Sequence, residues 1–276
     1  MKREIKNKVE INDLTICIPI RIDSESRKRN LSSLLTFLSR YVDAPVLVIE
    51  ADKQSLAGDL EFDKNCRYIF IEDKDPVFYR TKYINRMFHI VATPFAAIWD
   101  CDVIAYPHQI MAARDCLKNQ KLTLVYPYID FFIYMPPYFS DIFHRTKKLH
   151  LMDSENIEKR LFQGYGAVGG AYAVNVEKYL SIGGENENFY GWGPEDGERQ
   201  KRVEILEAGM GRVEGMLFHL YHSRGAGSYF PSEETQLRSM GEFCKVCSMT
   251  KEELSEYVTT CLVPLCKQGK SFLPRI

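Results

Sequence analysis

The sequence predicts an α/β fold in which a mostly parallel central sheet is flanked by helices and followed by a short helical tail. Over residues 14–100, short apolar runs rich in β-branched side chains alternate with segments whose apolar residues recur at helical spacing. Parallel strands joined by crossover helices produce this alternation. From Ser232 onward only helical spacing continues, so residues 231–276 are expected to form a helical extension.

Each expected element has its own signal. Apolar runs bounded by polar or turn residues predict buried strands at residues 14–20, 46–49, 68–71 and 95–99, and a further strand is expected at residues 212–222. Glycines flank a run of small residues at 171–174, where a ligand could approach the backbone. Helical spacing begins near Leu31, Tyr83, Gln109, Val176 and Glu195. Asn175 is the expected N-cap of the fourth helix, because its side chain can accept a bond from a free backbone N–H.

Composition and charge exclude several functions. The chain has 36 Lys and Arg against 37 Asp and Glu, so no overall field would gather nucleic acid. The one basic run, residues 27–29, has acids beside it and is interpreted as a solvated face. No window resembles a membrane span or a signal peptide. We expect a cytoplasmic protein, with peripheral attachment at the inner face of a membrane as the alternative.

Four of the eight cysteines lie near the C-terminus, at Cys244, Cys247, Cys261 and Cys266. Their spacing is compatible with a zinc site. The competing interpretation is a helix over residues 252–262, because Thr250 and Glu253 form a capping-box pattern. The helix is favoured, since no histidine or second tight knuckle supports zinc.

A loop at residues 191–196 is the first functional signal. Two glycines and a proline surround Trp192, which predicts an aromatic plate on a tight loop. Glu195 and Asp196 follow in the first turn of a predicted helix, where the helix dipole favours their ionised form. Such a place suits a sugar, whose C–H face stacks while its hydroxyls need acceptors. The alternative is an ordinary turn followed by helix-terminal acids.

Asp100 and Asp102, just after the strand expected at residues 95–99, are the second signal. In an extended chain such a pair projects to one side, so it could hold one divalent cation. Asp73 and Asp75 repeat the spacing, but they lie in a charged loop before a proline. The alternative is that Asp100 is a turn acid that ends the strand.

His219 and His222 are the third signal. A neutral imidazole can complete the coordination of a cation such as Mn²⁺. If the strand at residues 212–222 runs through both, alternation puts only one of them on the site side. One ligand and one packed or surface histidine are therefore expected.

The strand ends carry further polar residues. In a parallel sheet, ligands bind beyond the carboxyl ends of the strands, where Arg21 and Asp23 follow the first strand and Glu50 the second. No Gly-x-Gly-x-x-Gly pattern follows the first strand and no P-loop occurs, so a dinucleotide cofactor is not expected.

Several motifs occur together in this chain: Asp100-Cys101-Asp102, Gly169-Gly170, Ile182-Gly183-Gly184, Gly191-Trp192-Gly193-Pro194-Glu195-Asp196, Arg202, His219 and His222. In this combination the chain resembles the metal-dependent GT-A glycosyltransferases, which are Rossmann-like α/β enzymes, over about residues 14–228. Its second half is similar to the C-terminal region shared by β-1,4-galactosyltransferases, chondroitin polymerases and polypeptide N-acetylgalactosaminyltransferases.

The resemblance implies a UDP-sugar donor, a divalent metal (Mn²⁺ or Mg²⁺) and inversion at the anomeric carbon. By position, Asp102 is a metal ligand and Asp100 lies nearer the ribose and the metal. A histidine completes the metal site, with His222 favoured over His219 because alternative alignments select either. The positions that frame the uridine and diphosphate are Pro19, Arg21, Asp23, Glu50, Arg80, Asn85, Asp100 and Gly170.

The same resemblance assigns the acceptor side. Asp196 corresponds to the catalytic base, Glu195 to an acceptor-binding acid and Trp192 to the sugar-stacking platform. Pro194 replaces a glycine common in the galactosyltransferase motif, and Gly197 ends the acidic run. These departures leave the identity of the acceptor open.

The expected function is transfer of a hexose or N-acetylhexosamine from a UDP-sugar to a hydroxyl of a glycan acceptor, as in polysaccharide biosynthesis. Residues 1–230 would form the GT-A domain, with a nucleotide-binding half at about 14–105 and an acceptor and catalytic half at about 106–230. A sugar-nucleotide pyrophosphorylase is one alternative, although residues 20–26 lack the glycine-rich loop that it needs. A catalytically inactive carbohydrate- or nucleotide-binding module is the other.

Overall fold

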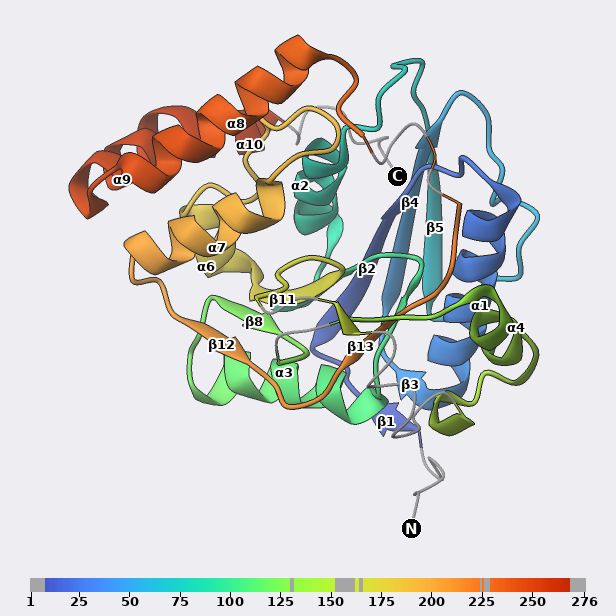
Figure 1. The fold of residues 1–276 in the computed structure, drawn as a ribbon. Helices are drawn as coiled ribbons and strands as arrows, with labels where there is room; N and C mark the ends of the chain where they lie inside the picture. The colour runs from blue at the N-terminus through green and yellow to red at the C-terminus, as the bar shows by residue number, and fades with distance from the viewer. Residues whose placement is uncertain are drawn as a thin grey trace.

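A seven-stranded sheet runs through the centre of the computed structural model, which describes residues 8–129, 132–151, 162–163, 166–223, 225 and 229–268 (Figure 1). The strand order is β12-β8-β11-β6-β2-β4-β5. The strands are β2 (Leu14–Ile20), β4 (Val46–Asp52), β5 (Cys66–Glu72), β6 (Phe95–Trp99), β8 (Leu124–Tyr126), β11 (Ala171–Asn175) and β12 (Met210–Arg212).

The predicted mostly parallel sheet is confirmed, with β11 as the exception. Strands β2, β4, β5 and β6 pair in parallel, and β12 is parallel to β8. Strand β11 lies antiparallel between β6 and β8, with Ala171 opposite Trp99. Because β11 is reversed, its first residues meet the carboxyl end of β6. The glycines before β11 therefore lie beside the acids that follow β6.

Helices cover both faces of this sheet. Figure 1 shows α1 (Glu25–Tyr41) and α4 (Pro137–Thr146) on one side, and α2 (Arg80–Ile90), α6 (Val176–Ser181) and α7 (Glu195–Ile205) on the other. The remaining helical elements are α3 (Pro107–Asn119), η1 (Leu149–Leu151), α8 (Glu233–Ser248), α9 (Lys251–Tyr257), η3 (Val258–Leu262) and α10 (Val263–Gln268). Asn175 caps α6 as predicted, since its side chain accepts from Lys178 N.

Two small sheets accompany the central one. One joins β1 (Val9–Glu10) to β3 (Val42–Asp43). The other has the order β10-β9-β13-β7. Its strands are β7 (Val103–Ile104), β9 (Phe132–Tyr134), β10 (Phe162–Gln163) and β13 (Leu217–His219). This second sheet carries one of the candidate histidines at the end of β13.

Two predicted elements have different bounds. Helix α1 begins at Glu25 rather than near Leu31, because the Ser24 hydroxyl caps it by accepting from Arg27 N. The single strand expected at residues 212–222 is two strands, β12 and β13, in separate sheets. Gly215 lies between them with φ +127°, a conformation that favours glycine, and a Cβ there would lie 2.5 Å from the side chain of Gln109.

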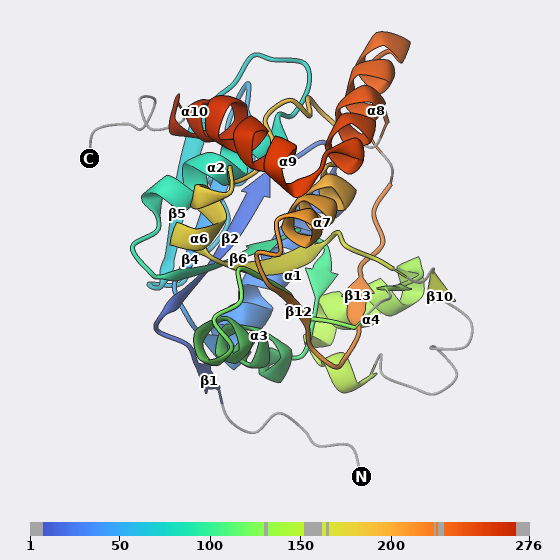
Figure 2. The ribbon, with the colours of Figure 1, turned by 90° about the vertical axis from the view of Figure 1, so that its left-hand side faces the viewer.

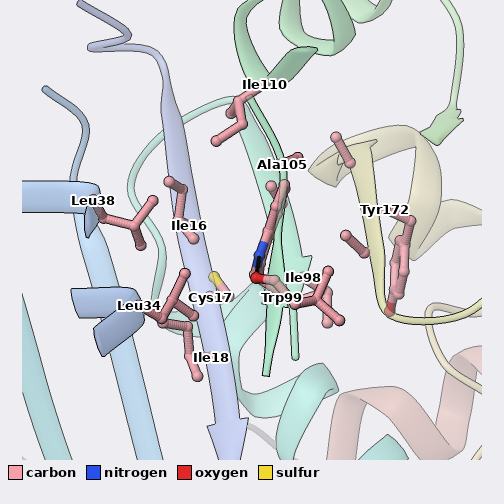
Figure 3. Close-up of a cluster of buried hydrophobic side chains, with 14 of the residues drawn as sticks. Ile16, Cys17, Ile18, Leu34, Leu38, Ile98, Trp99, Ala105, Ile110 and Tyr172 are labelled. Carbon is pink, nitrogen blue, oxygen red and sulfur yellow. Dashed lines mark hydrogen bonds between the residues drawn. The ribbon is translucent and has the colours of Figure 1, made fainter. Parts of the chain in front are cut away.

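The main core lies between the sheet and its helices. In Figure 3, Leu34 and Leu38 of α1 face Ile16 and Ile18 of β2, and all four are buried. The buried indole of Trp99 donates to the carbonyl of Val103 (2.7 Å), which ties the end of β6 to the start of β7. Burial of this kind is the main stabilisation of such a layer, and here it anchors the strand that precedes the acidic pair.

The helical extension lies together at the top of Figures 1 and 2, packed against α7. It has a small core of its own, formed by Val246, Leu254, Tyr257, Val258 and Leu262. Ile205 and Leu206 at the end of α7 pack against it. The predicted capping box of Thr250 and Glu253 is present. The tail is helical as predicted up to Gln268, and residues 269–276 lie outside the described residues. The domain boundary at residue 230 stays a prediction.

The zinc interpretation of the C-terminal cysteines finds no support. The structure describes all four of them, and in its described part the one group of at least three metal-binding side chains contains no cysteine.

Across the same described residues, no helix is long and apolar enough to cross a membrane.

Candidate active site at the carboxyl end of the sheet

The candidate residues gather where β2 and β6 end and where α1, α2 and α7 begin. Asp100 and Asp102 follow β6, Arg80 is the first residue of α2, and Glu195 and Asp196 open α7 as predicted. The backbone N–H of Asp100 donates to the carbonyl of Gly170 (2.8 Å), which brings the turn before β11 to this edge. Segments distant in the sequence thus form one site.

The two aspartates after β6 bind different partners. The backbone N–H of Val103 donates to the carbonyl of Asp100 (3.2 Å), so residues 100–103 form a turn instead of continuing the strand. Asp100 accepts from Arg80 Nη2 (2.8 Å), and Asp102 lies beside the histidines. The pair does not lie in an extended chain as expected, because a turn begins at Asp100, and a cation shared by both carboxylates stays a prediction.

Asp102, His219 and His222 form a compact cluster. One ligand atom from each lies within 4.8 Å of the other two. His219 Nε2 is 3.7 Å from Asp102 Oδ1, and His222 Nε2 is 3.3 Å from Asp102 Oδ2. Burial alone would raise the pKa of Asp102, but His219, Arg27 and His222 more than offset it and lower the pKa. The carboxylate is therefore held ionised.

Both histidines lie on the Asp102 side, so the expectation that strand alternation admits only one of them is wrong. Strand β13 ends at His219, and alternation does not continue to His222. The backbone N–H of Leu220 donates to the carbonyl of Asp102 (2.7 Å), and that of Tyr221 donates to Ser140 Oγ (2.8 Å). These bonds hold the segment between the two rings in an irregular path.

The donor set of this cluster fits a divalent transition-type cation. The Nδ1 of His222 lies 2.9 Å from the carbonyl of Ser223, and a carbonyl only accepts, so Nδ1 carries the proton. The other ring nitrogen, Nε2, faces Asp102 Oδ2 at 3.3 Å. A hydrogen bond on the second ring nitrogen is the usual way in which proteins orient a metal-binding histidine. One carboxylate with two imidazoles suits Mn²⁺.

Arg27 belongs to this site, although its basic run was interpreted as a solvated face. Its Nη1 lies 3.5 Å from Asp102 Oδ2, and its Nε donates to Asp23 Oδ1 (2.9 Å). Lys28 and Arg29 instead form ion pairs away from it, with Asp59 and Asp141. The signal that could have found Arg27 is Ser24, a residue type that caps helices, placed right after the first strand.

Arg80 links the two halves of the site. Besides Asp100, it approaches Asp196, with Nη1 3.9 Å from Asp196 Oδ1. Among the described residues this buried Nη1 has no hydrogen-bond partner. A guanidinium with a free donor between two carboxylates is suited to anionic oxygens. Arg80 thus bridges Asp100 and the neighbourhood of Asp196, and its predicted role in donor binding stays a prediction.

The two acids of α7 have different surroundings. The Asp196 side chain is 32% exposed, and its Oδ1 accepts from Arg199 Nη1 (2.8 Å). Glu195 is buried, and its Oε2 has no hydrogen-bond partner among the described residues. Burial, followed by the charge of Asp196, raises the pKa of Glu195 to about 8. The expectation that the helix dipole keeps both acids ionised is therefore wrong for Glu195, because desolvation exceeds the dipole's effect.

Replacing Glu195 by glutamine should stabilise the fold increasingly as pH rises. A folded-state pKa near 8, above the usual 4.5, means that the stability contributed by the protonated acid is complete below pH 4.5 and is lost by pH 8. The loss is on the order of 4 kcal/mol. The difference in Tm between Glu195→Gln and wild type should grow from pH 5 to pH 8.5. Glu204→Gln, on the exposed side of α7, is the matched control, and a constant difference for Glu195→Gln would contradict this pKa.

Trp192 stands on the loop before α7, as predicted. The side chain is 49% exposed, and the ring of Phe230 meets it edge-on at 4.9 Å between centroids. The loop is tight, since Gly191 has φ +81° and a Cβ there would clash with Val77. An indole braced by a second ring and open to solvent can stack on a sugar.

Three predicted donor-binding residues lie around the end of β2. Pro19 is buried within β2. Arg21 donates to the carbonyls of Ala51 and Asp75 and to Asp73 Oδ2, and these three hydrogen bonds fix its guanidinium within the protein. Asp23 binds Arg27 and also lies against Gly225, where a Cβ would be 2.4 Å from Asp23 Oδ2. Of the three, Asp23 is the one connected to the Asp102 cluster.

Glu50 and Asn85 are occupied by protein contacts. Glu50 is fully buried and accepts from the backbone N–H groups of Leu56 and Ala57, and from the hydroxyl groups of Ser55 and Tyr68. Asn85, also fully buried, bonds Glu185 through both ends of its amide, and Glu187 as well. Their contacts hold loops that border the site, and a role in donor binding stays a prediction.

Part of the chain is similar in sequence to known galactosyltransferases. Residues 152–224 match the family model described as the N-terminal domain of galactosyltransferase. Human β-1,4-galactosyltransferase 4 is 28% identical over 91 residues, which are 32% of this chain and 26% of that protein. The sequence match thus covers about a quarter of the relative's length.

A solved enzyme structure shares this architecture. Glucosyl-3-phosphoglycerate synthase from M. tuberculosis superposes with a TM-score of 0.52 at 13% identity, covering 86% of this chain and 81% of that chain. The catalytic domain of Drosophila β-1,4-galactosyltransferase 7 has a TM-score of 0.45 at 18% identity, covering 81% and 79%. The predicted fold is confirmed: this chain has the GT-A fold of glycosyltransferases, and its residues 152–224 match the galactosyltransferase family model.

Proposed function

We propose that this protein is an inverting, metal-dependent glycosyltransferase that moves a hexose or N-acetylhexosamine from a UDP-sugar to a hydroxyl of a glycan acceptor. The observation that carries the proposal is the placement of two functional groups on either side of the Asp100–Arg80 pair. The Asp102, His219 and His222 cluster lies on one side and the Asp196 carboxylate on the other. The galactosyltransferase match at residues 152–224 supports the same class.

The metal would be held by Asp102, His219 and His222. When bound, Mn²⁺ or Mg²⁺ would neutralise the charge that develops on the departing diphosphate. The M. tuberculosis enzyme of the same fold was crystallised with Mg²⁺ and uridine diphosphate, which supports this assignment. Arg27, 3.5 Å from Asp102 Oδ2, and Arg80, which binds Asp100, would contact the phosphate oxygens.

Asp196 would act as the base. It removes the proton from the acceptor hydroxyl while that oxygen attacks the anomeric carbon, and UDP leaves with the electrons of the broken C–O bond. Trp192 would stack on the acceptor sugar, and Glu195, whose protonated form can donate, would bind one of its hydroxyls. Such a single displacement needs no enzyme nucleophile. A cytoplasmic location, or attachment at the inner face of a membrane, stays a prediction.

The test is UDP release from a panel of UDP-hexoses and UDP-N-acetylhexosamines with Mn²⁺, with Mg²⁺ and with chelator. We expect metal-dependent release with one preferred donor. The stereochemistry of the product, read by NMR, then decides between inversion and retention. No release from any donor, together with no metal-dependent UDP binding by calorimetry, would overturn the proposal and leave a binding module as the interpretation.

A further inference from the structure

A buried arginine lies directly behind Asp196, and neither the sequence pattern nor the proposed mechanism assigns it a role. Arg199 is on α7, one turn after Asp196, and its side chain is fully buried. Its Nη1 donates to Asp196 Oδ1 (2.8 Å). Its Nε and Nη2 donate to the two carboxylate oxygens of Glu185, each at 2.9 Å. One guanidinium thus joins a solvent-facing acid to a buried one.

Glu185 is itself held from several directions. The hydroxyl groups of Tyr172 (2.6 Å) and Tyr179 (2.7 Å) donate to its Oε1. Burial alone would raise the pKa of Glu185, but Arg199 and these hydroxyls hold it at about 2. The ring of Tyr172 also lies 3.8 Å from the guanidinium carbon of Arg199. This packing leaves Arg199 a single position, since a bidentate fork stacked on a ring has little rotational freedom.

The arrangement separates the two oxygens of Asp196. Oδ1 is bound by Arg199 and approached by Arg80, whereas no described residue donates a hydrogen bond to Oδ2. Oδ2 lies against the glycine turn before β11, where a Cβ at Gly169 would be 2.6 Å away. The absence of a side chain at Gly169 therefore keeps the space around this oxygen open.

The charge of Arg199 is already offset by Glu185. Two of the hydrogen bonds of Arg199 go to Glu185 and one to Asp196, so the buried carboxylate holds the guanidinium that orients the solvent-facing one.

We propose that Arg199, clamped by Glu185, is a positioning residue that orients Asp196 so that Oδ2 meets the acceptor hydroxyl. The inference rests on the proposed function, in which Asp196 is the base. It adds a residue pair that determines how well that base is aimed.

Arg202 provides a matched control on the same helix. It too is fully buried and paired with a carboxylate, through Nε to Glu198 Oε1 (2.9 Å). It also donates to the carbonyls of Ile182 (2.6 Å) and Gly184 (2.7 Å), so it ties α7 to the preceding loop as Arg199 does. It makes no contact with Asp196. If Arg199 had only a structural role, replacing either arginine should have the same effect on kcat and Tm.

The test compares steady-state kinetics and Tm for Arg199→Lys and Arg202→Lys. Lysine keeps the charge but loses the fork. We expect Arg199→Lys to lower kcat by about 10- to 100-fold, the cost of a misplaced catalytic group. Its KM values for donor and acceptor should stay within about 3-fold of wild type, because Arg199 binds neither. Arg202→Lys should lower Tm without a matching loss of kcat. Equal kcat losses in both variants, or a loss confined to KM, would overturn the proposal.

Two further measurements keep the proposal testable if Arg199→Lys does not fold or if the proposed function is wrong. If Arg199→Lys does not fold, the neutral double variant Glu185→Gln with Arg199→Gln replaces it, and the same split between kcat and KM is expected. In an Asp196→Asn background, either change should cost less than about 3-fold, since a group that acts only through Asp196 has nothing left to orient. If wild type transfers no sugar, the proposed function fails by itself. The structure of the variant then decides, because an Asp196 carboxylate that keeps its place would overturn the positioning role.

Discussion

Replacing Asp102 by alanine is expected to abolish Mn²⁺ binding and to reduce sugar transfer by more than about 10²-fold. Asp102 is the carboxylate on which both histidines converge, at 3.7 and 3.3 Å. Removing even an outer partner of a metal ligand typically costs 10- to 100-fold in metal affinity, and the loss of the ligand itself should exceed that. Calorimetric titration with Mn²⁺ and UDP measures the binding, and UDP release measures the transfer.

The same titration ranks the two histidines. His219→Ala and His222→Ala should each weaken Mn²⁺ binding, whereas His108→Ala, an exposed histidine on α3, should leave it unchanged. Unaltered Mn²⁺ affinity in Asp102→Ala would show that the cluster of Asp102, His219 and His222 is not the metal site. If only one histidine variant weakens binding, that residue alone is the ligand.

Replacing Asp196 by asparagine is expected to lower kcat by about 10²- to 10⁴-fold, the range of a positioned general base. Affinity for the UDP-sugar should stay nearly intact, because the proposed metal ligands are Asp102, His219 and His222, and none of them is paired with Asp196. Asparagine keeps the shape and can still accept from Arg199, so α7 should fold normally. Single-turnover transfer measures the chemical step, and calorimetry with UDP-sugar measures the binding.

Glu195→Gln serves as the control for this base assignment. Glu195 is adjacent, buried and largely protonated at neutral pH, since its pKa is raised to about 8. It is therefore suited to donate a hydrogen bond to the acceptor more than to remove a proton, and its variant should change the acceptor KM more than kcat. Turnover that survives in Asp196→Asn and disappears in Glu195→Gln would move the base to Glu195.

Signals that act within a few residues led to correct predictions. The strand bounds 14–20 and 95–99 are those of β2 and β6, and the caps at Asn175 and Thr250 are present. Apolar runs, caps and turn residues depend on neighbouring positions, so the sequence alone contains what they need. The same holds for the two acids at the start of α7.

Predictions that extended a local rule across a break were wrong. Strand alternation was carried from β6 into Asp100 and Asp102, and through His219 to His222, but both segments leave the strand first. A helix dipole argument described Glu195 without its burial, which is a property of packing around the residue. The extent of a strand and the depth of a side chain both depend on contacts made elsewhere in the chain.

By itself, the sequence determined the α/β order of elements, the end of the sheet that carries the polar residues, and the acids and histidines of the candidate site. Only the tertiary structure decided which of them meet. Arg27 reaches Asp102 and Arg199 joins Asp196 to Glu185, whereas the carboxylate of Glu50 is used up by its own loop. The physical reason is that the hydrogen-bond and ion-pair partners of a buried charged side chain depend on how the elements pack together. Spacing along the chain does not determine those partners.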